Sequence, residues 1–525
     1  MRKRTPARSC LWLLASAALV LASAAPARQD GGARPDAPAT AQPPSGVWYE
    51  IFVRAWYDTD GDGIGDLNGV TAKLDYLKSL GVDGLWLMPV NPSPSYHGYD
   101  VTDYEAINPQ YGSMADFRRL LAEAHKRGMR VIIDLVINHT SDRHPWFQAA
   151  RDPADPHHRW YTWAGTRADL GAVSATGGPA WHALDGRHYL GVFTGEMPDL
   201  DYDTPAVREA MVGVGRYWLD LGVDGFRLDA AQHIYLDFQS QWGDPRAVAK
   251  NVRWWQDFRA GLAASNPRAY LVGEVTQDSP AGLAPYVRPL DAVFDFPLAV
   301  RLIESVKQER DRGILAQALP MAAAYAAAGR ATGDAPFLSN HDQERVMSRL
   351  QGDARHMRVA AALLLTLPGE PFVYYGEELG LQGKKPDPDL REPMRWNRRA
   401  DAPGETRWKP LTANRGGDVS VEAQDADPRS LLNLYRTLIH WRAGLPALRE
   451  GDLHGFDAGD PQLVAYTRAT PGQKLLVVHN LSGRAKTLPL APTQGFAELL
   501  RSTSAGARLD HGRLLLPAYA SAVLR

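Results

Sequence analysis

The sequence predicts an α/β fold: a (β/α)8 TIM barrel with an inserted domain after the third strand and a C-terminal β-sandwich. From Val47 onward, eight short apolar runs alternate with longer amphipathic segments, as strands alternate with helices. This alternation favours parallel strands joined by right-handed crossovers, and eight such strands close into a barrel. With 525 residues, 45% of them hydrophobic, the chain can form several globular domains.

The expected strands are apolar over most of their length, as in VIID and YLVG, which is typical of strands buried on both faces. They cover residues 47–57, 84–90, 131–139, 225–231, 270–275, 292–298, 335–342 and 371–380. The segments between them with helical periodicity include 67–80, 114–128, 206–222 and 253–264. The order of these elements predicts the barrel.

The first 25 residues predict a secretory signal peptide. Basic residues precede the apolar run LWLLASAALVLASAA, which ends in small residues suited to cleavage. A membrane anchor is the alternative, but the run is short for a full span. Residues 26–46 are rich in Pro, Ala and Gly and predict a flexible leader. We therefore expect a periplasmic or secreted protein, with no membrane segment in the mature form.

Charge and cysteine content limit the possible partners. Removal of residues 1–25 takes away four cations and no acid, so the net charge changes from −2 to −6. A negative mature chain argues against nucleic acid as a partner. The one cysteine, Cys10, lies in the signal peptide, so we expect neither disulfides nor thiol chemistry afterwards.

Two parts of the chain depart from the alternation. Residues 140–205 are rich in Gly, Asp, His and Trp and follow the third expected strand, so they predict an inserted domain B at the barrel mouth. Beyond residue 450 the runs become short and strand-like, as in LVAYTRA and KLLVVHNL. We expect the barrel over 47–139 and 206–445, domain B over 140–205 and the β-sandwich over 450–525.

Four acids lie at the ends of apolar runs: Asp134, Asp229, Glu274 and Asp342. A carboxylate at the C-terminal end of a parallel barrel strand lies at the mouth of the barrel, where substrates bind. Several acids converging there, together with two histidines and an arginine, are typical of a retaining glycosidase.

The stretches DLVINH, GFRLDAAQH, VGEV and FLSNHD resemble, in order, the four signature regions of the α-amylase family, glycoside hydrolase family 13. The resemblance covers nearly all of the mature chain and implies a nucleophile at Asp229, a general acid/base at Glu274 and a transition-state-stabilising carboxylate at Asp342. Asp134 matches a signature position that supports neighbouring loops, so it stays outside this catalytic set.

Arg227 precedes Asp229 by two residues and therefore lies on the same strand face. We count Arg227 among the residues that contact the sugar and expect its charge to keep the Asp229 carboxylate ionised, and burial beside other acids to keep Glu274 protonated. His139 and His341 adjoin signature residues and are expected to donate hydrogen bonds to sugar hydroxyls. The resemblance adds three further sugar contacts: Tyr99, an aromatic platform or otherwise a core residue; His233, within Gln-His where many members have Lys-His; and Arg391 in REPMRW.

The stretch DTDGDGIGD (58–66) carries alternate aspartates around a glycine turn, and hard oxygen ligands of this kind suit calcium. The helix-loop-helix calcium motif fails, because Gly69 stands where it requires glutamate. The stretch resembles the calcium loop after the first barrel strand of many family members. We predict Ca²⁺ ligands at Asp58, Asp60, Asp62, Asp66 and the carbonyl of Ile64; a solvated acidic turn is the alternative.

The resemblance implies hydrolysis of α-1,4 bonds in an α-glucan or maltooligosaccharide, with no partner protein. MPDLD (197–201) is similar to the fifth signature of the group intermediate between oligo-1,6-glucosidases and neopullulanases. Ala230, directly after Asp229, resembles many α-1,4 enzymes, whereas α-1,6 enzymes tend to carry valine there. A maltodextrin glucosidase, a 4-α-glucanotransferase and a sucrose- or trehalose-converting enzyme remain open. A non-catalytic sugar-binding barrel is disfavoured, because a binding protein has no need of all three catalytic acids.

Overall fold

The computed structural model describes residues 46–330 and 333–525. The predicted signal peptide, and the predicted leader apart from Gly46, lie outside these residues. None of the helices within the described ranges is long and apolar enough to cross a membrane.

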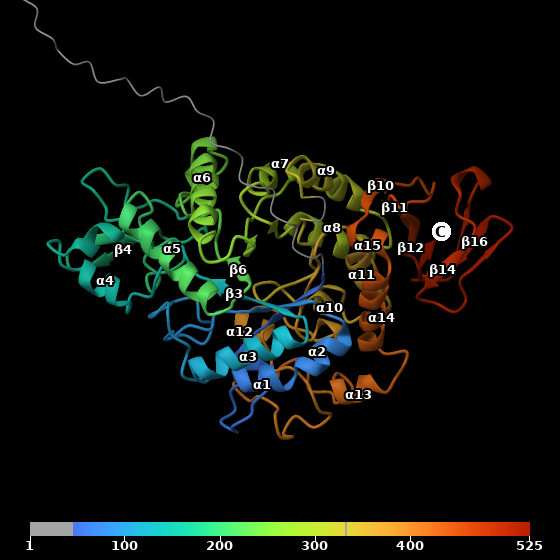
Figure 1. Ribbon diagram of the computed structural model, residues 1–525, viewed down its shortest axis with the longest axis horizontal. Coiled ribbons are helices and arrows are strands. Elements are labelled where there is room, and N and C mark those ends of the chain that lie inside the picture. Colours follow the sequence, from blue (N-terminus) through green and yellow to red (C-terminus); the bar gives the residue numbers. More distant parts are fainter. Residues whose placement is uncertain (1–45, 331–332) are drawn as a thin grey trace, which may run out of the picture. The chain divides into compact units, whose positions relative to one another are not determined.

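A parallel sheet lies at the centre of the barrel (Figure 1). Its strands, in the order β8-β7-β6-β3-β2-β1-β9, are β1 (Trp48–Ile51), β2 (Gly84–Leu87), β3 (Arg130–Leu135), β6 (Gly225–Leu228), β7 (Tyr270–Gly273), β8 (Ala292–Val293) and β9 (Phe372–Tyr374). Parallel bridges from Phe294 to Ala335 and from Phe337 to Phe372 place segment 335–337 between β8 and β9. This segment is the eighth predicted strand, so the predicted barrel is confirmed.

Large aromatic side chains fill the barrel interior. The ring of Trp48 stacks on Tyr270 with centroids 4.9 Å apart and on Phe372 with centroids 5.8 Å apart. Trp86 and Phe294 belong to the same buried cluster. Because the interior is packed, a substrate can be bound only above it, by residues at the ends of the strands.

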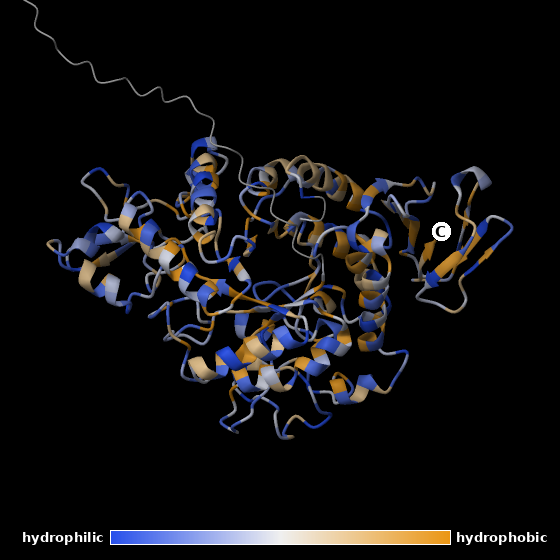
Figure 2. Cartoon of the chain, viewed as in Figure 1, coloured by the Kyte–Doolittle hydropathy of each residue, from blue (hydrophilic) through white to orange (hydrophobic). Residues whose placement is uncertain are grey.

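Amphipathic helices pack around the sheet, and Figure 2 shows hydrophobic and hydrophilic residues alternating along them. In α3 the buried residues recur at helical spacing, and a capping box between Ser113 and Asp116 fixes the first turn. The longer helices are α1 (Leu67–Ala72), α2 (Leu74–Leu80), α3 (Met114–Lys126), α5 (Pro205–Asp220), α6 (Pro245–Leu262), α8 (Phe296–Lys307), α9 (Ile314–Ala327), α11 (Ala354–Thr366) and α14 (Leu431–Gly444). Shorter helices include α7 (Pro280–Leu283), α10 (Val346–Arg349), α12 (Asp387–Leu390), α13 (Val421–Asp425) and α15 (Pro446–Glu450).

Several predicted elements differ from the structure. The strand expected over 371–380 covers only β9, and a 3-10 helix over Glu377–Leu379 follows it. The first strand ends at Ile51, and a 3-10 helix over Val53–Ala55 follows it. The run 292–298 is strand only at β8, because the Asp295 side chain accepts a hydrogen bond from the amide of Leu298 and starts helix α8. The single helix expected over 67–80 is two helices, divided at Lys73.

Domain B follows β3 and contains an antiparallel hairpin of β4 (Trp181–Leu184) and β5 (Arg187–Leu190). Its other regular elements are the helix α4 (Pro145–Ala150) and the 3-10 helix η2 (Pro156–Trp160). An antiparallel bridge from His139 to Asp199 joins its two ends, and a second bridge, from Tyr161 to Leu200, ties an interior segment to the second end. The segment therefore leaves and re-enters the barrel at the end of β3.

Two antiparallel sheets form the C-terminal β-sandwich. One contains β10 (Asp452–Gly455), β11 (Leu463–Thr470), β12 (Gln473–Asn480), β17 (Ser521–Leu524) and β14 (Leu499–Ser502), and the other β13 (Lys486–Pro489), β16 (Arg513–Leu516) and β15 (Arg508–Asp510). Along β11, Leu463 and Ala465 belong to the sandwich core, whereas Val464 and Tyr466 belong to the main core. Both faces of this strand are therefore buried, which explains its nearly continuous apolar sequence.

Candidate functional site

A cavity of about 380 Å³ opens at the carboxyl ends of the barrel strands. Asp229 directly follows β6, Glu274 directly follows β7, and Asp342 follows the bridged segment 335–337. All three predicted catalytic acids line the cavity, together with His97, Tyr99, His139, Thr176, Phe193, Thr194, Met197, Asp387 and Arg391.

Arg227 on β6 binds three carboxylates at once. Its Nη1 donates to Asp134 Oδ1 at 2.8 Å and to Asp229 Oδ1 at 2.5 Å, and its Nη2 lies 2.8 Å from Glu274 Oε2. The Arg227 side chain is 1% exposed, so it lies behind the carboxylates rather than against a sugar. Predicted as a sugar contact, Arg227 instead positions the two reacting acids.

One guanidinium serves two buried acids, Asp134 and Asp229, and the partly exposed Glu274. Burial raises the pKa of Asp229 to about 8; the charge of Arg227 lowers it, and Glu274 and Asp134 raise it. The charge of Arg227 therefore acts in the direction that the sequence predicted, but burial outweighs it.

The backbone after β6 links the two reacting acids. Ala230 has a φ of 48°, in the left-handed region that residues other than glycine seldom adopt. In this conformation its N–H donates to Glu274 Oε2 at 3.0 Å. The turn that follows Asp229 therefore helps to fix the position of Glu274.

A second network holds Asp342. The buried ring of His341 lies 2.6 Å from Glu50 Oε1 through Nδ1, and its Nε2 lies 3.1 Å from Asp342 Oδ2 and 2.6 Å from the Tyr99 hydroxyl. Burial alone would lower the pKa of His341, but Asp342 and Glu50 raise it to about 9. Both ring nitrogens have protein partners, so His341 orients Asp342 and Tyr99, and its predicted hydrogen bond to a sugar stays a prediction.

Arg391 completes this side of the cavity. It donates through Nη2 to Asp342 Oδ1 at 2.8 Å and through Nε to the His341 carbonyl at 3.0 Å. Burial would raise the pKa of Asp342, but His341 and Arg391 together hold it well below its usual range. Asp342 is therefore ionised, and 44% of its side chain is exposed toward the cavity.

His139 lines the cavity, but both of its ring nitrogens lie within the wall. Its Nε2 lies 3.0 Å from the carbonyl of Tyr99, and because a carbonyl only accepts, Nε2 carries the proton. Burial lowers the pKa of His139 to about 4, so the ring is neutral and Nδ1, which is buried, carries no proton. Neither ring nitrogen therefore presents to the cavity the donor that the sequence predicted.

Tyr99 lines the cavity as predicted, and its hydroxyl donates to Asp134 Oδ2 at 3.0 Å. His233 does not line it: Nδ1 lies 3.0 Å from the Leu236 carbonyl, and Nε2 is 3.1 Å from the Gln232 amide. Glu50 was not among the predicted site residues, although an acid inside the apolar run WYEI was a signal for it.

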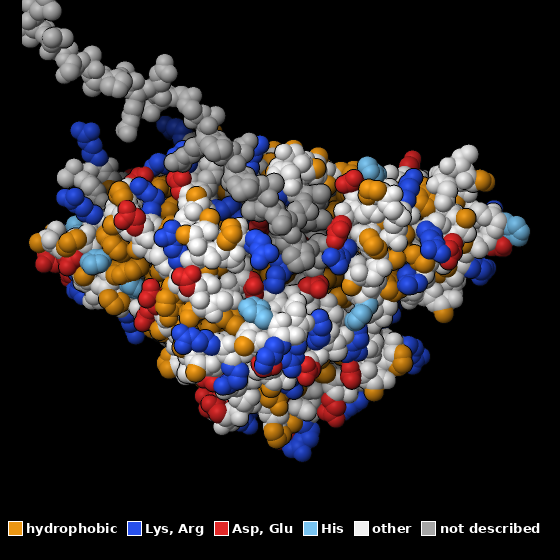
Figure 3. Space-filling model, in the orientation of Figure 1, with side chains coloured by type: hydrophobic (Ala, Val, Ile, Leu, Met, Phe, Trp, Pro, Cys, Tyr) orange, Lys and Arg blue, Asp and Glu red, His pale blue; other side chains and the backbone are white. Residues whose placement is uncertain are grey.

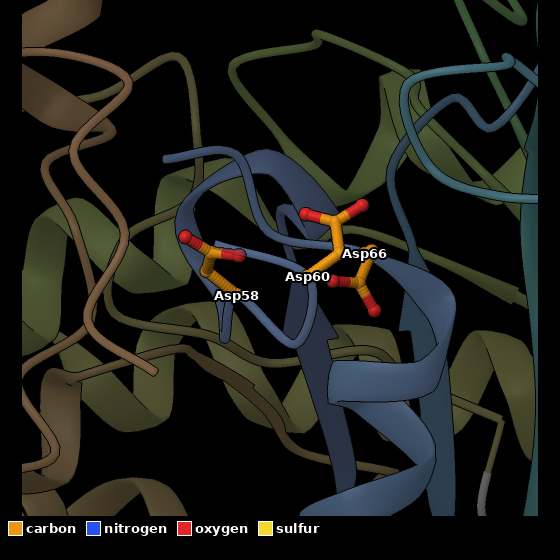
Figure 4. Close-up of side chains that lie close together, drawn as sticks. All are labelled: Asp58, Asp60 and Asp66. Carbon is orange, nitrogen blue, oxygen red and sulfur yellow. The ribbon is translucent and has the colours of Figure 1, made fainter. Parts of the chain in front are cut away.

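Three of the five predicted calcium ligands cluster in the loop after β1. Ligand oxygens of Asp58, Asp60 and Asp66 all lie within 4.8 Å of one another (Figure 4). Three carboxylates so placed are the hard donors that calcium prefers. Asp62 is outside this group, and its Oδ1 accepts from the amide of Ile64 at 2.7 Å.

Two family models match the chain. The model of the alpha amylase catalytic domain matches residues 50–451. The model of the alpha-amylase SusG C-terminal domain matches residues 463–523.

Similar proteins extend over both regions. Alpha-amylase 3 of Dictyoglomus thermophilum is 40% identical over 438 residues, which cover 83% of this chain and 84% of that protein. A 4-alpha-glucanotransferase of Thermotoga maritima is 34% identical over 445 residues, or 83% and 96% of the two chains. The crystal structure of an alpha-amylase from H. orenii superposes with a TM-score of 0.83 at 42% identity, over 92% of this chain and 99% of that one. Fold, site and relatives agree, and the chain belongs to the α-amylase family, glycoside hydrolase family 13.

Proposed function

We propose that the protein is an exported α-amylase that hydrolyses α-1,4 bonds of starch, maltodextrins and related α-glucans with retention of configuration. The observation that carries the proposal is that the two nitrogens of one guanidinium bind Asp229 and Glu274. Sharing Arg227 favours the short carboxyl separation of retaining enzymes, about 5–5.5 Å, over the about 6.5–9.5 Å that an inverting enzyme needs for a water.

The reaction then follows from the site. Glu274 protonates the leaving oxygen while Asp229 bonds to the anomeric carbon; Glu274 next removes a proton from water, whose oxygen displaces Asp229. Asp342, held ionised by His341 and Arg391, stabilises the positive charge that develops on the sugar. Tyr99 supplies the face for the ring bound at the reacting carbon.

The sequence supports the proposed export, and the surface supports an uncharged substrate. The basic start, apolar run and small residues of the first 25 positions support secretion into the periplasm or the medium. On the face shown in Figure 3, basic and acidic side chains are interspersed, as befits a neutral polysaccharide substrate.

Transfer to a second sugar is the next candidate reaction. A 4-alpha-glucanotransferase and a trehalose synthase/amylase of Mycolicibacterium smegmatis are 34% and 33% identical to the chain. The covalent intermediate on Asp229 is the same in hydrolysis and transfer. The two reactions differ in whether water or a sugar hydroxyl displaces the carboxylate.

Proton NMR of the products from maltotetraose and isomaltotriose tests the proposal. The first product of maltotetraose should be the α-anomer, and kcat/KM should be at least tenfold higher for maltotetraose, about 1.4 kcal/mol. Ala230, rather than valine, beside the nucleophile supports this preference. An initial β-anomer would exclude retention, and a preference for isomaltotriose would assign the chain to the oligo-1,6-glucosidase type.

We expect kcat/KM for maltotetraose to rise as the pH rises toward about 8, because burial raises the pKa of Asp229 to about 8 and only the ionised carboxylate can bond to the anomeric carbon. Initial rates from about pH 6 to about pH 10, with circular dichroism at each pH, separate this change from unfolding. A kcat/KM that falls between about pH 6 and about pH 8 would contradict a raised pKa at Asp229.

We further propose that Asp58, Asp60 and Asp66 hold Ca²⁺ in the loop after β1, with the carbonyl of Ile64 as a further donor. A bound ion would stabilise the folded chain, so a chelator should lower Tm by several degrees and added Ca²⁺ should restore it. Differential scanning calorimetry measures the effect, and the matched control is Asp60→Asn, which should abolish the response to Ca²⁺. If the chelator left the Tm of the wild type unchanged, the loop would be a solvated turn that binds no calcium.

A further inference from the structure

A second cavity, of about 380 Å³, lies in the long segment between helices α12 and α13. Residues 391–420 of this segment form neither helix nor strand. All residues that line the second cavity lie between Pro393 and Arg415, and none of them lines the catalytic cavity. Irregular segments of this length are uncommon in compact domains and are usually functional, and the cavity has the size of a small-molecule site.

The lining of the second cavity is basic. Among the described residues that form it, four are cations, Arg395, Arg407, Lys409 and Arg415, and one is an acid, Glu405. Cations gathered around one cavity repel each other, and an anion placed among them relieves the repulsion. The charges therefore favour a negatively charged ligand.

Two of the four cations are compensated within the cavity wall. The Nζ of Lys409 lies 2.6 Å from Asp389 Oδ1. Arg395 is fully buried, and its Nε lies 3.7 Å from Glu405 Oε2. The acid of the lining therefore offsets Arg395, and the charges that remain belong to the other two arginines.

Arg407 and Arg415 are both able to bind a ligand. Both residues are exposed, and within the described part of the chain neither guanidinium forms a salt bridge. The Nε of Arg415 donates to the Leu411 carbonyl at 3.0 Å, which leaves its two Nη groups as donors. Guanidinium forks of this kind bind phosphate oxygens in pairs. A phosphate monoester, with a charge of about −1.5 to −2 at neutral pH, matches two cations better than a carboxylate does.

Thr406, which precedes Arg407 in the chain, also lines the second cavity and is 3% exposed. Its hydroxyl has no hydrogen-bond partner among the described residues. A buried hydroxyl without a partner is unfavourable, and an oxyanion bound at the adjacent Arg407 brings an acceptor close to it. The hydroxyl is a second observation, besides the charges, that indicates an anion.

The remaining residues of the lining are apolar: Pro393, Ala400, Pro410 and Leu411. Inorganic phosphate would leave these walls without a contact, whereas a small organic group attached to the phosphate would cover them. We propose that the second cavity binds a small phosphate monoester, such as a hexose phosphate, whose phosphate group is bound by Arg407 and Arg415.

The second cavity adjoins the loop after β1. The N–H of Arg407 donates to the carbonyl of Gly63 at 2.7 Å, and the N–H of Asp58 donates to the carbonyl of Gly404 at 3.0 Å. A ligand on Arg407 therefore holds the segment to which this loop is attached. Because such a ligand binds the folded chain only, it should raise Tm.

Isothermal titration calorimetry at constant ionic strength tests the site with glucose 6-phosphate, inorganic phosphate and glucose. Glucose 6-phosphate should bind at one site per chain and more tightly than inorganic phosphate, and glucose should show no binding that depends on Arg407. Arg407→Ala and Arg415→Ala should each raise the dissociation constant of glucose 6-phosphate about tenfold or more, the loss of one charge-assisted contact. Arg398→Ala removes an exposed arginine of the same segment that does not line the cavity, so this control should bind as the wild type does.

An unchanged dissociation constant in both cavity variants, with circular dichroism showing the wild-type fold, would overturn the proposal. An equal loss in Arg398→Ala would also overturn it, because general attraction to basic side chains would then explain the binding. Inorganic phosphate that binds as tightly as glucose 6-phosphate would overturn the assignment to a monoester and leave free phosphate as the ligand. Competitive inhibition of maltotetraose hydrolysis by glucose 6-phosphate that persists in both cavity variants would place the ligand in the catalytic cavity instead.

Discussion

Replacing Asp229 by Asn lowers kcat on maltotetraose by about 10⁴-fold or more, the scale of loss seen when a nucleophile is removed. Asparagine keeps the size of the side chain but cannot form the ester with the anomeric carbon. The Arg227 guanidinium still binds two carboxylates in the variant, so Tm and the dissociation constant for a maltooligosaccharide should change little. Loss of activity without loss of binding is the signature of a group that acts only when the bond breaks.

Asp334→Asn is the matched control for this variant. Asp334 is buried, and burial raises its pKa well above the usual value, so an amide should be tolerated there. It does not line the cavity. The kcat of Asp334→Asn should stay within about threefold of the wild type, since substitutions away from the reacting groups leave transition-state binding intact. More than about a tenth of wild-type kcat in Asp229→Asn would exclude Asp229 as the nucleophile.

Replacing Glu274 by Gln lowers kcat/KM on maltotetraose by about 10³-fold, at the centre of the range for a lost general acid. The same variant should still release fluoride from α-maltosyl fluoride in a first turnover, because fluoride departs without a proton. Stopped-flow measurement of the fluoride burst tests this. Added azide, which needs no base, should then restore turnover.

Asp229→Asn should show neither the burst nor the azide effect, so the pair of variants assigns both roles. A Glu274→Gln enzyme that loses the fluoride burst as completely as it loses maltotetraose hydrolysis would place Glu274 outside the acid/base role. The Glu274 side chain also accepts a hydrogen bond from the N–H of Ala230. Glutamine keeps one side-chain oxygen that can accept this bond, so the substitution should change the structure little.

Those parts of the site that depend on local sequence were predictable. Each of Asp229, Glu274 and Asp342 follows an apolar run, and a strand of a closed barrel leaves its next residue at the mouth. Glu50 was not predictable in the same way, because its partner His341 is 291 residues away. The protonation of Asp229 also depends on three carboxylates that meet only in the folded chain.

The strand boundaries, too, were only partly predictable from the pattern of apolar residues. The apolar letters of 292–298 favour a strand, yet the Asp295 cap starts helix α8 within them, so a single polar side chain decides the element. His233 adjoins a signature motif, but its ring turns toward Leu236 rather than toward the cavity. Proximity in sequence placed it near the site without fixing its direction.

The left-handed turn at Ala230 restricts how this enzyme could evolve a new bond preference. Valine is disfavoured at a φ of 48° because its branched Cβ crowds the backbone. A mutation from alanine to valine would change the volume beside Asp229 and, at the same time, disturb the amide that binds Glu274. An evolutionary route to α-1,6 cleavage through this position therefore requires an earlier change that relaxes the turn, and glycine is the intermediate that the backbone tolerates.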